Sequence, residues 1–135
     1  MDSGGYLDNL LVPTLYGADK KSLTEISAES KKLIAVARSG RIDPALLANG
    51  TFTVTNLGMF GVESYTPIIN PPQTAILGVC SVQVRFKEED GKLMHYPAMG
   101  LSLTYDHRAI DGAPAARFSK DLAVMLEDIN SFVET

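Results

Sequence analysis

The sequence has few of the residues that metal sites, disulfide scaffolds and nucleic-acid surfaces require. Its 135 residues include one cysteine, two histidines and no tryptophan, so an internal disulfide is impossible and a zinc cluster has too few ligands. Positive charge is also scarce, because 12 lysines and arginines are set against 16 aspartates and glutamates, for a formal net charge of -4. A general phosphate-binding surface is not indicated, and we expect no metal and no nucleic-acid partner.

Long apolar runs are missing as well. The longest, such as residues 75–80, fall far short of the roughly 20 residues that a membrane-spanning helix needs, and the chain starts without the basic and apolar segments of an export signal. We therefore expect no membrane partner and a reducing compartment. In that setting Cys80, which lies within an apolar run, is expected to be a small buried side chain.

The residues that are present have the composition of one packed domain. Hydrophobic residues make up 45% of the chain and charged residues 21%, which is not the composition of a disordered tail. Residues 1–8 are expected to be a linker or a frayed end. Residues 9–16 are apolar enough to predict a short strand that tolerates Pro13 near a sheet edge.

Two places in the first half have the signals that begin helices. Ser22 and Glu25 have the spacing of a capping box, in which each side chain bonds the backbone amide of the other residue. Apolar residues at helical spacing follow, which predicts a helix over residues 22–39. Asp43 and Pro44 predict a second, very short helix, because aspartate caps helices and proline is tolerated in the first turn.

The second half of the chain has the pattern of strands followed by a helix. Threonines alternate with Phe52 and Val54, a period of two that predicts a half-buried strand with its hydroxyls on one face. Helices on either side of several strands predict an α+β fold, with helices packed on a mostly antiparallel or mixed sheet. The expected elements are a strand over 51–56, a glycine-containing loop over 57–61, an extended segment over 64–69, a strand over 74–86, a turn over 87–92, a return strand ending near Tyr105, and a helix over 113–132.

His107 is the residue whose setting most suggests chemistry. It lies among charged side chains where a predicted strand passes directly into a predicted helix, and such rigidly held loops concentrate reactive groups. His95 follows a charged turn and is expected to face solvent. From the residues alone, a surface histidine and a catalytic base are equally open at His107.

Other chemistries have less support around His107. A metal shared by His107 and Asp111 would lack further ligands, and the sequence has no G-x-S-x-G elbow to supply a serine nucleophile. A histidine base without a protein nucleophile suits a reaction whose nucleophile belongs to a substrate, such as a thiol.

Three segments resemble the dihydrolipoamide acyltransferases, the E2 components of 2-oxoacid dehydrogenase complexes. Residues 106–112, Asp-His-Arg-Ala-Ile-Asp-Gly, resemble their H-x-x-x-D-G signature, and residues 17–23 and 50–61 (continued by 68–73) are similar to the same family in the same order. The resemblance implies a two-layer helix-on-sheet fold of the chloramphenicol-acetyltransferase type, truncated at the N-terminus. Residues 1–135 would then be the C-terminal part of the catalytic domain.

The resemblance also implies roles for three side chains. His107 would be the general base that takes the proton from the thiol of coenzyme A or dihydrolipoamide. Thr55, at a position where many relatives carry serine, would donate its hydroxyl to the oxyanion of the tetrahedral intermediate. Asp111 would contact the imidazole or hold the loop by pairing with an arginine. The Asn-Leu-Gly-Met-Phe-Gly sequence of residues 56–61 resembles pyruvate-type enzymes and favours acetyl as the acyl group.

The implied partners follow from the same resemblance. Coenzyme A and lipoamide would be substrates, with the lipoyl group on a domain absent from this chain. The assembly would be a homotrimer, possibly within a larger core, with active sites between neighbours and with E1 and E3 components bound through other domains. The compartment would be the bacterial cytoplasm or the mitochondrial matrix. The alternative is a non-catalytic, E2-related core or scaffold subunit; this truncated chain alone is expected to be inactive or nearly so.

Overall fold

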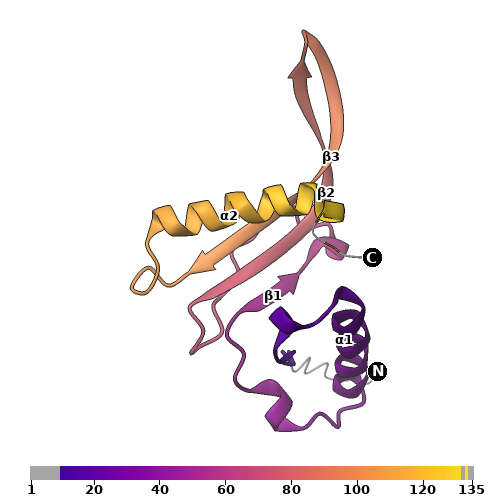
Figure 1. The fold of residues 1–135 in the computed structure, drawn as a ribbon, viewed down its shortest axis with the longest axis vertical. Helices are drawn as coiled ribbons and strands as arrows, with labels where there is room; N and C mark the ends of the chain where they lie inside the picture. The colour runs from indigo at the N-terminus through magenta and orange to yellow at the C-terminus, as the bar shows by residue number, and fades with distance from the viewer. Residues whose placement is uncertain (1–9, 132, 134–135) are drawn as a thin grey trace, which may run out of the picture. The chain divides into compact units, whose positions relative to one another are not determined.

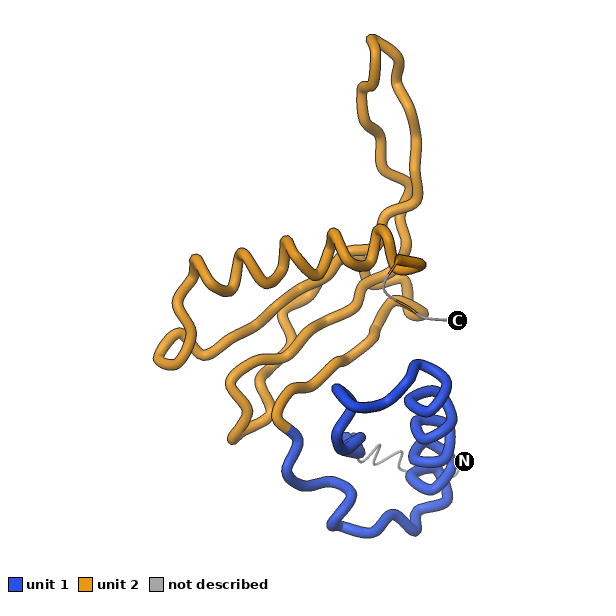
Figure 2. Tube along the Cα trace, viewed as in Figure 1, with its two compact units in different colours: residues 1–50 blue, residues 51–135 orange. Residues whose placement is uncertain are grey.

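A computed structural model describes residues 10–131 and residue 133 of the chain. In chain order, the described residues form one longer helix, three strands and a second longer helix, with short 3-10 turns between some of these elements and after the last helix (Figure 1). The chain forms two compact units, residues 1–50 and residues 51–135 (Figure 2).

The first unit contains helix α1, Leu23–Arg38, as predicted. The predicted capping box begins it: the Ser22 hydroxyl accepts from the Glu25 amide at 3.3 Å, and the Glu25 carboxylate accepts from the Ser22 amide at 2.8 Å. These bonds to Ser22 lower the pKa of the Glu25 carboxyl below its ordinary value. Helix α1 ends before Gly40, whose φ of 68° is readily adopted only by glycine.

The predicted strand over residues 9–16 is wrong for the part of it that the structure describes. Residues 10–15 form no strand, and the segment is held by single bonds, such as that from the Thr14 amide to the Leu46 carbonyl at 2.7 Å. Pro13 lacks an amide donor, so a ladder cannot continue through it. Residues 1–9, including the predicted linker, lie outside the described part of the chain.

The predicted short helix after Asp43 is confirmed as a 3-10 turn. It is η2, Pro44–Leu47, and its N-terminus is capped by the Asp43 carboxylate, which accepts from the Ala45 amide at 2.9 Å. The Tyr16 hydroxyl lies 2.8 Å from the carbonyl oxygens of both Ala45 and Ala48. Tyr16 thereby ties the start of the first unit to this turn.

The second unit is a three-stranded mixed sheet with one helix across it. The strands are β1 (Thr53–Asn56), β2 (Ala75–Glu89) and β3 (Lys92–Tyr105) in the order β1-β2-β3. Strand β1 is parallel to β2, and β2 is antiparallel to β3. Helix α2, Gly112–Glu127, lies across one face of the sheet (Figure 1). This arrangement confirms the predicted α+β class and the mixed sheet.

The two faces of this sheet differ in chemistry. Apolar side chains from β2 and β3, including Ala75 and Leu103, meet Ala115 of α2. Because side chains alternate along a strand, the residues between them point to the opposite face, where the register aligns Thr55 with Gly78 and Ser102. The buried hydrophobic residues described in the second unit are Ile76 and three small residues, Ala75, Cys80 and Ala115. The prediction of a buried Cys80 is confirmed.

The hairpin between β2 and β3 is longer and its turn tighter than predicted. Only Asp90 and Gly91, with φ values of 53° and 73°, form the turn, and both strands continue into the predicted turn region. Asp-Gly with two positive φ angles matches the twist of the flanking strands. A register shift lies between Val79 and Val82, and beyond it the hairpin projects past α2 (Figure 1).

Residues 64–69, predicted as an extended segment, belong to no strand of the sheet, and Tyr65 contacts the sheet through its side chain. One further predicted element differs from the structure. Helix α2 ends at Glu127 and is followed by a 3-10 turn, η4, Ile129–Ser131, so it is shorter than the predicted 113–132. The predicted loop over 57–61 is confirmed and contains the turn η3, Gly58–Phe60.

Candidate active site

The loop between β3 and α2 presents His107 to solvent. The Asp106 amide donates to the Thr74 carbonyl at 2.8 Å, and the Asp106 carbonyl accepts from the amides of Ala109 and Ile110 at 2.9 and 3.0 Å. These bonds close a tight turn, and His107 is exposed within it. Its ring lies 5.8 Å from that of Tyr105, centroid to centroid. The imidazole is therefore free to meet a substrate.

A charged pair flanks His107 in the sequence. The Arg108 guanidinium donates three bonds to the Asp106 carboxylate, at 2.6, 3.0 and 3.2 Å, and the Arg108 amide donates a fourth at 2.9 Å. These bonds from Arg108 lower the pKa of Asp106 to about 2. Asp106 thus stays ionised and paired near neutral pH, which makes it a clamp on the turn rather than an acid or base.

Asp111 begins helix α2 as its N-cap residue. Its carbonyl accepts from the Ala115 amide at 3.2 Å, but its exposed carboxylate makes no capping bond. Among the described residues, no hydrogen bond joins the Asp111 side chain to His107 or to an arginine. Arg108, the arginine closest to it in sequence, is held by Asp106. The contacts expected for Asp111 are therefore not made by the residues that the structure describes.

Thr55 lies on β1 and is fixed by an aromatic residue that the sequence analysis missed. The Tyr65 hydroxyl donates to the Thr55 carbonyl at 2.9 Å. The Tyr65 ring also lies over Gly78, which is the residue opposite Thr55 on β2; a Cβ added to Gly78 would be 2.8 Å from Tyr65 Cζ. A glycine within an otherwise apolar strand was the available signal, because such a glycine often marks a close approach.

One chain does not bring Thr55 and His107 together. Thr55 aligns across the sheet with Ser102, three residues before the end of β3 at Tyr105. Tyr105 lies two strands away from Thr55 and three residues further along, and these two displacements together separate the residues by about 14 Å. Because side chains alternate along a strand, an offset of three residues also places the side chains of Thr55 and Tyr105 on opposite faces of the sheet. His107 follows Tyr105, so the two predicted site residues lie at different places on the unit.

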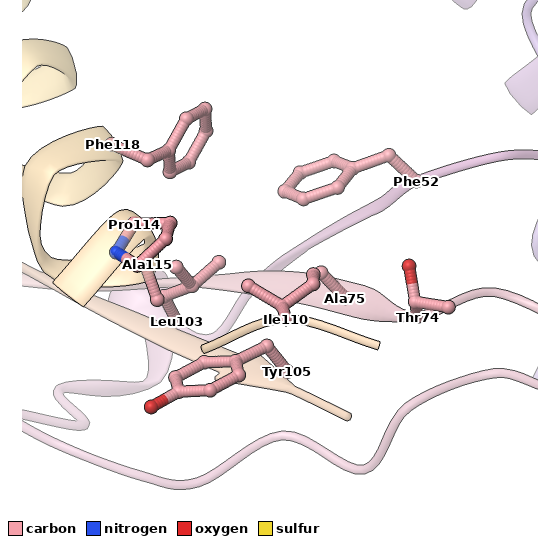
Figure 3. A pocket seen from close by; sticks show the side chains of 9 residues that line it. All are labelled: Phe52, Thr74, Ala75, Leu103, Tyr105, Ile110, Pro114, Ala115 and Phe118. Atoms are coloured by element: carbon pink, nitrogen blue, oxygen red, sulfur yellow. The ribbon is translucent and has the colours of Figure 1, made fainter. Parts of the chain in front are cut away.

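An apolar pocket lies beneath the His107 loop (Figure 3). It has a volume of about 320 Å³ and lies between the start of α2 and the sheet. Ile110, from the loop itself, points into it, and Phe52 and Phe118 meet edge to face across it with ring centroids 6.3 Å apart. Two of its lining residues carry a hydroxyl, Thr74 and Tyr105, and none carries a carboxylate, an imidazole or a thiol. The pocket therefore anchors the loop mainly through apolar contacts such as that of Ile110.

The described residues contain neither a cluster of metal ligands nor a helix that could span a membrane. No group of three or more histidines, cysteines, aspartates or glutamates there is arranged to hold a metal ion. Neither of the longer helices combines the length and apolar character that crossing a bilayer takes, over the part of the chain described.

Comparison with known proteins decides the family. Residues 6–133 match the model of the catalytic domain of 2-oxoacid dehydrogenase acyltransferases. The chain belongs to this acyltransferase family. The relationship predicted from the three sequence segments is thereby confirmed.

Curated relatives of this acyltransferase chain act in several complexes. It is 42% identical to the dihydrolipoyllysine-residue acetyltransferase component of the acetoin cleaving system of Bacillus subtilis, covering 90% of this chain and 30% of that protein. It is also 42% identical to the acetyltransferase component of the pyruvate dehydrogenase complex of Azotobacter vinelandii, over 93% of this chain and 20% of that protein. A third relative, again 42% identical, is the succinyltransferase component of the 2-oxoglutarate dehydrogenase complex of A. vinelandii, matched over 88% of this chain and 30% of that protein.

Solved structures share the fold. The dihydrolipoamide acetyltransferase of A. vinelandii matches with a TM-score of 0.86 at 42% identity, over 93% of this chain and 51% of that chain. Its structure was solved to examine the roles of a serine, a histidine and an asparagine in the catalytic mechanism. A truncated catalytic core from Thermoplasma acidophilum matches with a TM-score of 0.75 at 42% identity over 90% and 53%. The acyltransferase chain thus spans about half the length of these cores and less than a third of the curated relatives above.

Proposed function

We propose that this chain supplies the base and the oxyanion donor of a dihydrolipoamide acetyltransferase, which moves an acetyl group between dihydrolipoamide and coenzyme A. The observation that carries the proposal is a spacing. In the A. vinelandii enzyme, the serine under study lies 52 residues before the histidine, and the asparagine lies four residues after it. Thr55 lies 52 residues before His107, and Asp111 four residues after it.

The proposed chemistry is acyl transfer between two thiols. His107 removes the proton from the thiol of one substrate, and the thiolate attacks the thioester carbonyl of the other. A C–S bond forms and the carbonyl oxygen becomes an oxyanion, to which the Thr55 hydroxyl donates. When the intermediate collapses, the original C–S bond breaks and the imidazolium returns the proton to the departing thiolate. Both thiols belong to substrates, which agrees with the lack of a nucleophile elbow in the sequence.

Thr55 and Asp111 each differ from the residue studied in the A. vinelandii enzyme. Threonine keeps the hydroxyl donor of serine, although its extra methyl restricts the rotamer. Aspartate keeps the acceptor oxygen of asparagine but loses the amide donor. We therefore assign Asp111 the role of accepting a bond, from a donor outside the described residues, that positions the His107 loop.

The complete site would need two copies of the chain. Thr55 and the end of β3 lie about 14 Å apart on opposite faces of the sheet, so His107 from one copy would work with Thr55 from a neighbour. We propose a homotrimer, and a larger core is consistent with the cubic core of a related pyruvate dehydrogenase complex. Lipoyl domains and the E1 and E3 components would be partners through other domains, in the bacterial cytoplasm or the mitochondrial matrix.

The acyl group is assigned to acetyl on the Asn-Leu-Gly-Met-Phe-Gly sequence of residues 56–61. Acetyl and succinyl relatives are equally identical to this chain, at 42%, so overall identity does not separate the two. Transfer rates from acetyl and succinyl coenzyme A to dihydrolipoamide decide the assignment. Faster succinyl transfer would overturn the choice of acetyl.

A scaffold without turnover is the second candidate, and one observation favours it. The chain spans about half of the solved catalytic cores, so its own residues form only part of such a core. The test is an exchange in which this chain replaces the matching segment of the A. vinelandii catalytic core. Acetyl transfer by the exchanged enzyme supports the catalytic proposal, whereas a correctly assembled but inactive enzyme supports the scaffold.

A further inference from the structure

A side-chain hydrogen bond joins β1 to the segment that precedes β2. The Thr53 hydroxyl donates to the Gln73 Oε1 atom at 2.6 Å, and Thr53 is only 7% exposed. Because Thr53 is buried, water does not readily replace this bond, and loss of the Gln73 acceptor would leave a buried hydroxyl without a partner. The bond therefore fixes where the Gln73 side chain lies.

The backbone around Gln73 lies outside the strand ladder. Residues 70–74 belong to no strand, and the pairing of β2 with β3 begins one residue later, with Ala75 opposite Tyr105. The Gln73 amide donates to the Asn70 carbonyl at 3.0 Å, a bond that closes a turn within the segment itself. The bond from Thr53, in contrast, ties the segment to a strand of the sheet.

The residue after Gln73 holds the loop that contains His107. The Thr74 carbonyl accepts from the Asp106 amide at 2.8 Å, one residue beyond the last pair of the ladder. Further along the loop, Ile110 points into the apolar pocket that Thr74 also lines (Figure 3). The Thr74 carbonyl is thus an anchor for the first residue of the loop, and its place depends on that of Gln73.

The proposed base depends on such an anchor. His107 directly follows Asp106, and a displacement of a catalytic group by about 1 Å can cost about 10²-fold in rate. We propose that Gln73 is a positioning residue for His107: held by Thr53, it fixes the Thr74 carbonyl to which the Asp106 amide bonds. Its part in the reaction rests on the proposed function, whereas its hold on the loop does not.

A second buried hydroxyl offers a matched comparison. Thr104 of β3 and Thr53 of β1 both align with Ile76 of β2, so the two threonines lie on the same face of the sheet. The Thr104 hydroxyl oxygen is buried and has no hydrogen-bond partner among the described residues. Thr53→Val and Thr104→Val therefore remove the same group from similar places, and only Thr53→Val breaks a bond to Gln73.

Amide hydrogen exchange in the 135-residue chain, measured by nuclear magnetic resonance without substrates, tests the hold on the loop. We expect the Asp106 amide to exchange roughly tenfold faster in Thr53→Val. Thr53→Ser keeps the hydroxyl, so this variant and Thr104→Val should exchange at the unsubstituted rate. The Ala115 amide, which bonds the Asp111 carbonyl, is the internal reference and should be unchanged in every variant.

The acetyl-transfer rate of the exchanged A. vinelandii core tests the part of Gln73 in the reaction. A displaced base weakens stabilisation of the transition state more than binding of the substrates. Thr53→Val should therefore lower kcat about tenfold with little change in KM, and Thr53→Ser should restore kcat. If Thr53→Val does not fold, Gln73→Met takes its place, because it removes the acceptor from the other end of the same bond.

Each contrary result overturns a stated part of the proposal. Equal acceleration of the Asp106 and Ala115 amides shows a general loss of stability, and an unchanged Asp106 amide shows that the bond does not hold the loop. Faster amide exchange with unchanged kcat shows that Gln73 does not position the base. An unsubstituted exchanged core without turnover contradicts the proposed function instead, and the amide measurement still decides the hold on the loop.

Discussion

Tyr65 fixes the backbone of Thr55 from outside the sheet. Its hydroxyl donates to the Thr55 carbonyl at 2.9 Å, and its ring lies against the bare backbone of Gly78 on the adjacent strand. Thr55 is on the edge strand β1, whose other side has no partner strand among the described residues. The position of the proposed oxyanion donor therefore depends on a residue ten positions further along the chain.

Tyr65→Phe should destabilise the second unit modestly. The substitution keeps the ring over Gly78 and removes only the bond to Thr55, which is worth about 0.5–1.5 kcal/mol. Urea denaturation measures the change. Tyr96→Phe is the control, because the described residues give the Tyr96 hydroxyl no hydrogen bond. Equal stability of Tyr65→Phe and the unsubstituted chain would show that the bond contributes nothing.

Gly78→Ala should be clearly destabilising. The new methyl would be 2.8 Å from Tyr65 Cζ and 3.0 Å from its oxygen, and such overpacking costs about 1–3 kcal/mol. Gly112→Ala is the matched control, because its methyl would lie at an ordinary 3.5 Å from the Tyr105 oxygen. In a double-mutant cycle, Tyr65→Ala should relieve part of the cost of Gly78→Ala. Additive effects would contradict the proposed contact.

The capping box of α1 should make the first unit sensitive to acid. The pKa of Glu25 is lowered by its bonds to Ser22, so the ionised form stabilises the folded state above the ordinary glutamate pKa of about 4.3. That contribution is lost as the pH falls through the lowered pKa. Helix content measured by circular dichroism should therefore fall at low pH, and Glu25→Gln should remove this part of the dependence.

Ser22→Ala tests the same box at neutral pH, where loss of an N-cap costs about 0.5–2 kcal/mol. Thr24→Ala, within the first turn but outside the box, is the control. If the two substitutions have equal effects on unfolding, the cap is not what stabilises this end of the helix.

Local patterns were the part of the fold that the sequence could predict. The capping box of Ser22 and Glu25 and the cap at Asp43 act within three residues, so their spacing alone identifies them. The strand pattern that ends near Tyr105 and the helix that follows likewise predicted the strand-to-helix crossing at His107. The H-x-x-x-D-G segment, together with residues 17–23 and 50–61, predicted the family.

Long-range contacts account for the rest. The apolar residues 10–15 look like a strand but find no ladder partner, and 64–69 contribute side chains such as Tyr65 instead of backbone bonds. The pairing of Asp106 with Arg108 is a local contact that was missed as well. Neither the Tyr65 bond to Thr55 nor the separation of Thr55 from His107 has a local signal, because both depend on which strands become neighbours.

Thr55 should affect the rate of acetyl transfer through its hydroxyl. Losing one donor to an oxyanion costs about 10²–10³-fold in kcat, so Thr55→Ala in the exchanged A. vinelandii core should be slowed by that much. Thr55→Ser keeps the hydroxyl and should remain close to the unsubstituted rate. If alanine and serine at this position give the same kcat, Thr55 is a strand residue without a role in the reaction.

The most direct test of the central proposal is the acetyl-transfer rate of His107→Ala in that exchanged core, with His95→Ala as the matched control. His95 is exposed on β3 and belongs to no part of the proposed site. Removing a general base costs about 10²–10⁴-fold in kcat. We predict a loss of that size for His107→Ala with the assembly intact and near-normal turnover for His95→Ala. Near-normal turnover of a correctly assembled His107→Ala enzyme would contradict the assignment of His107 as the base.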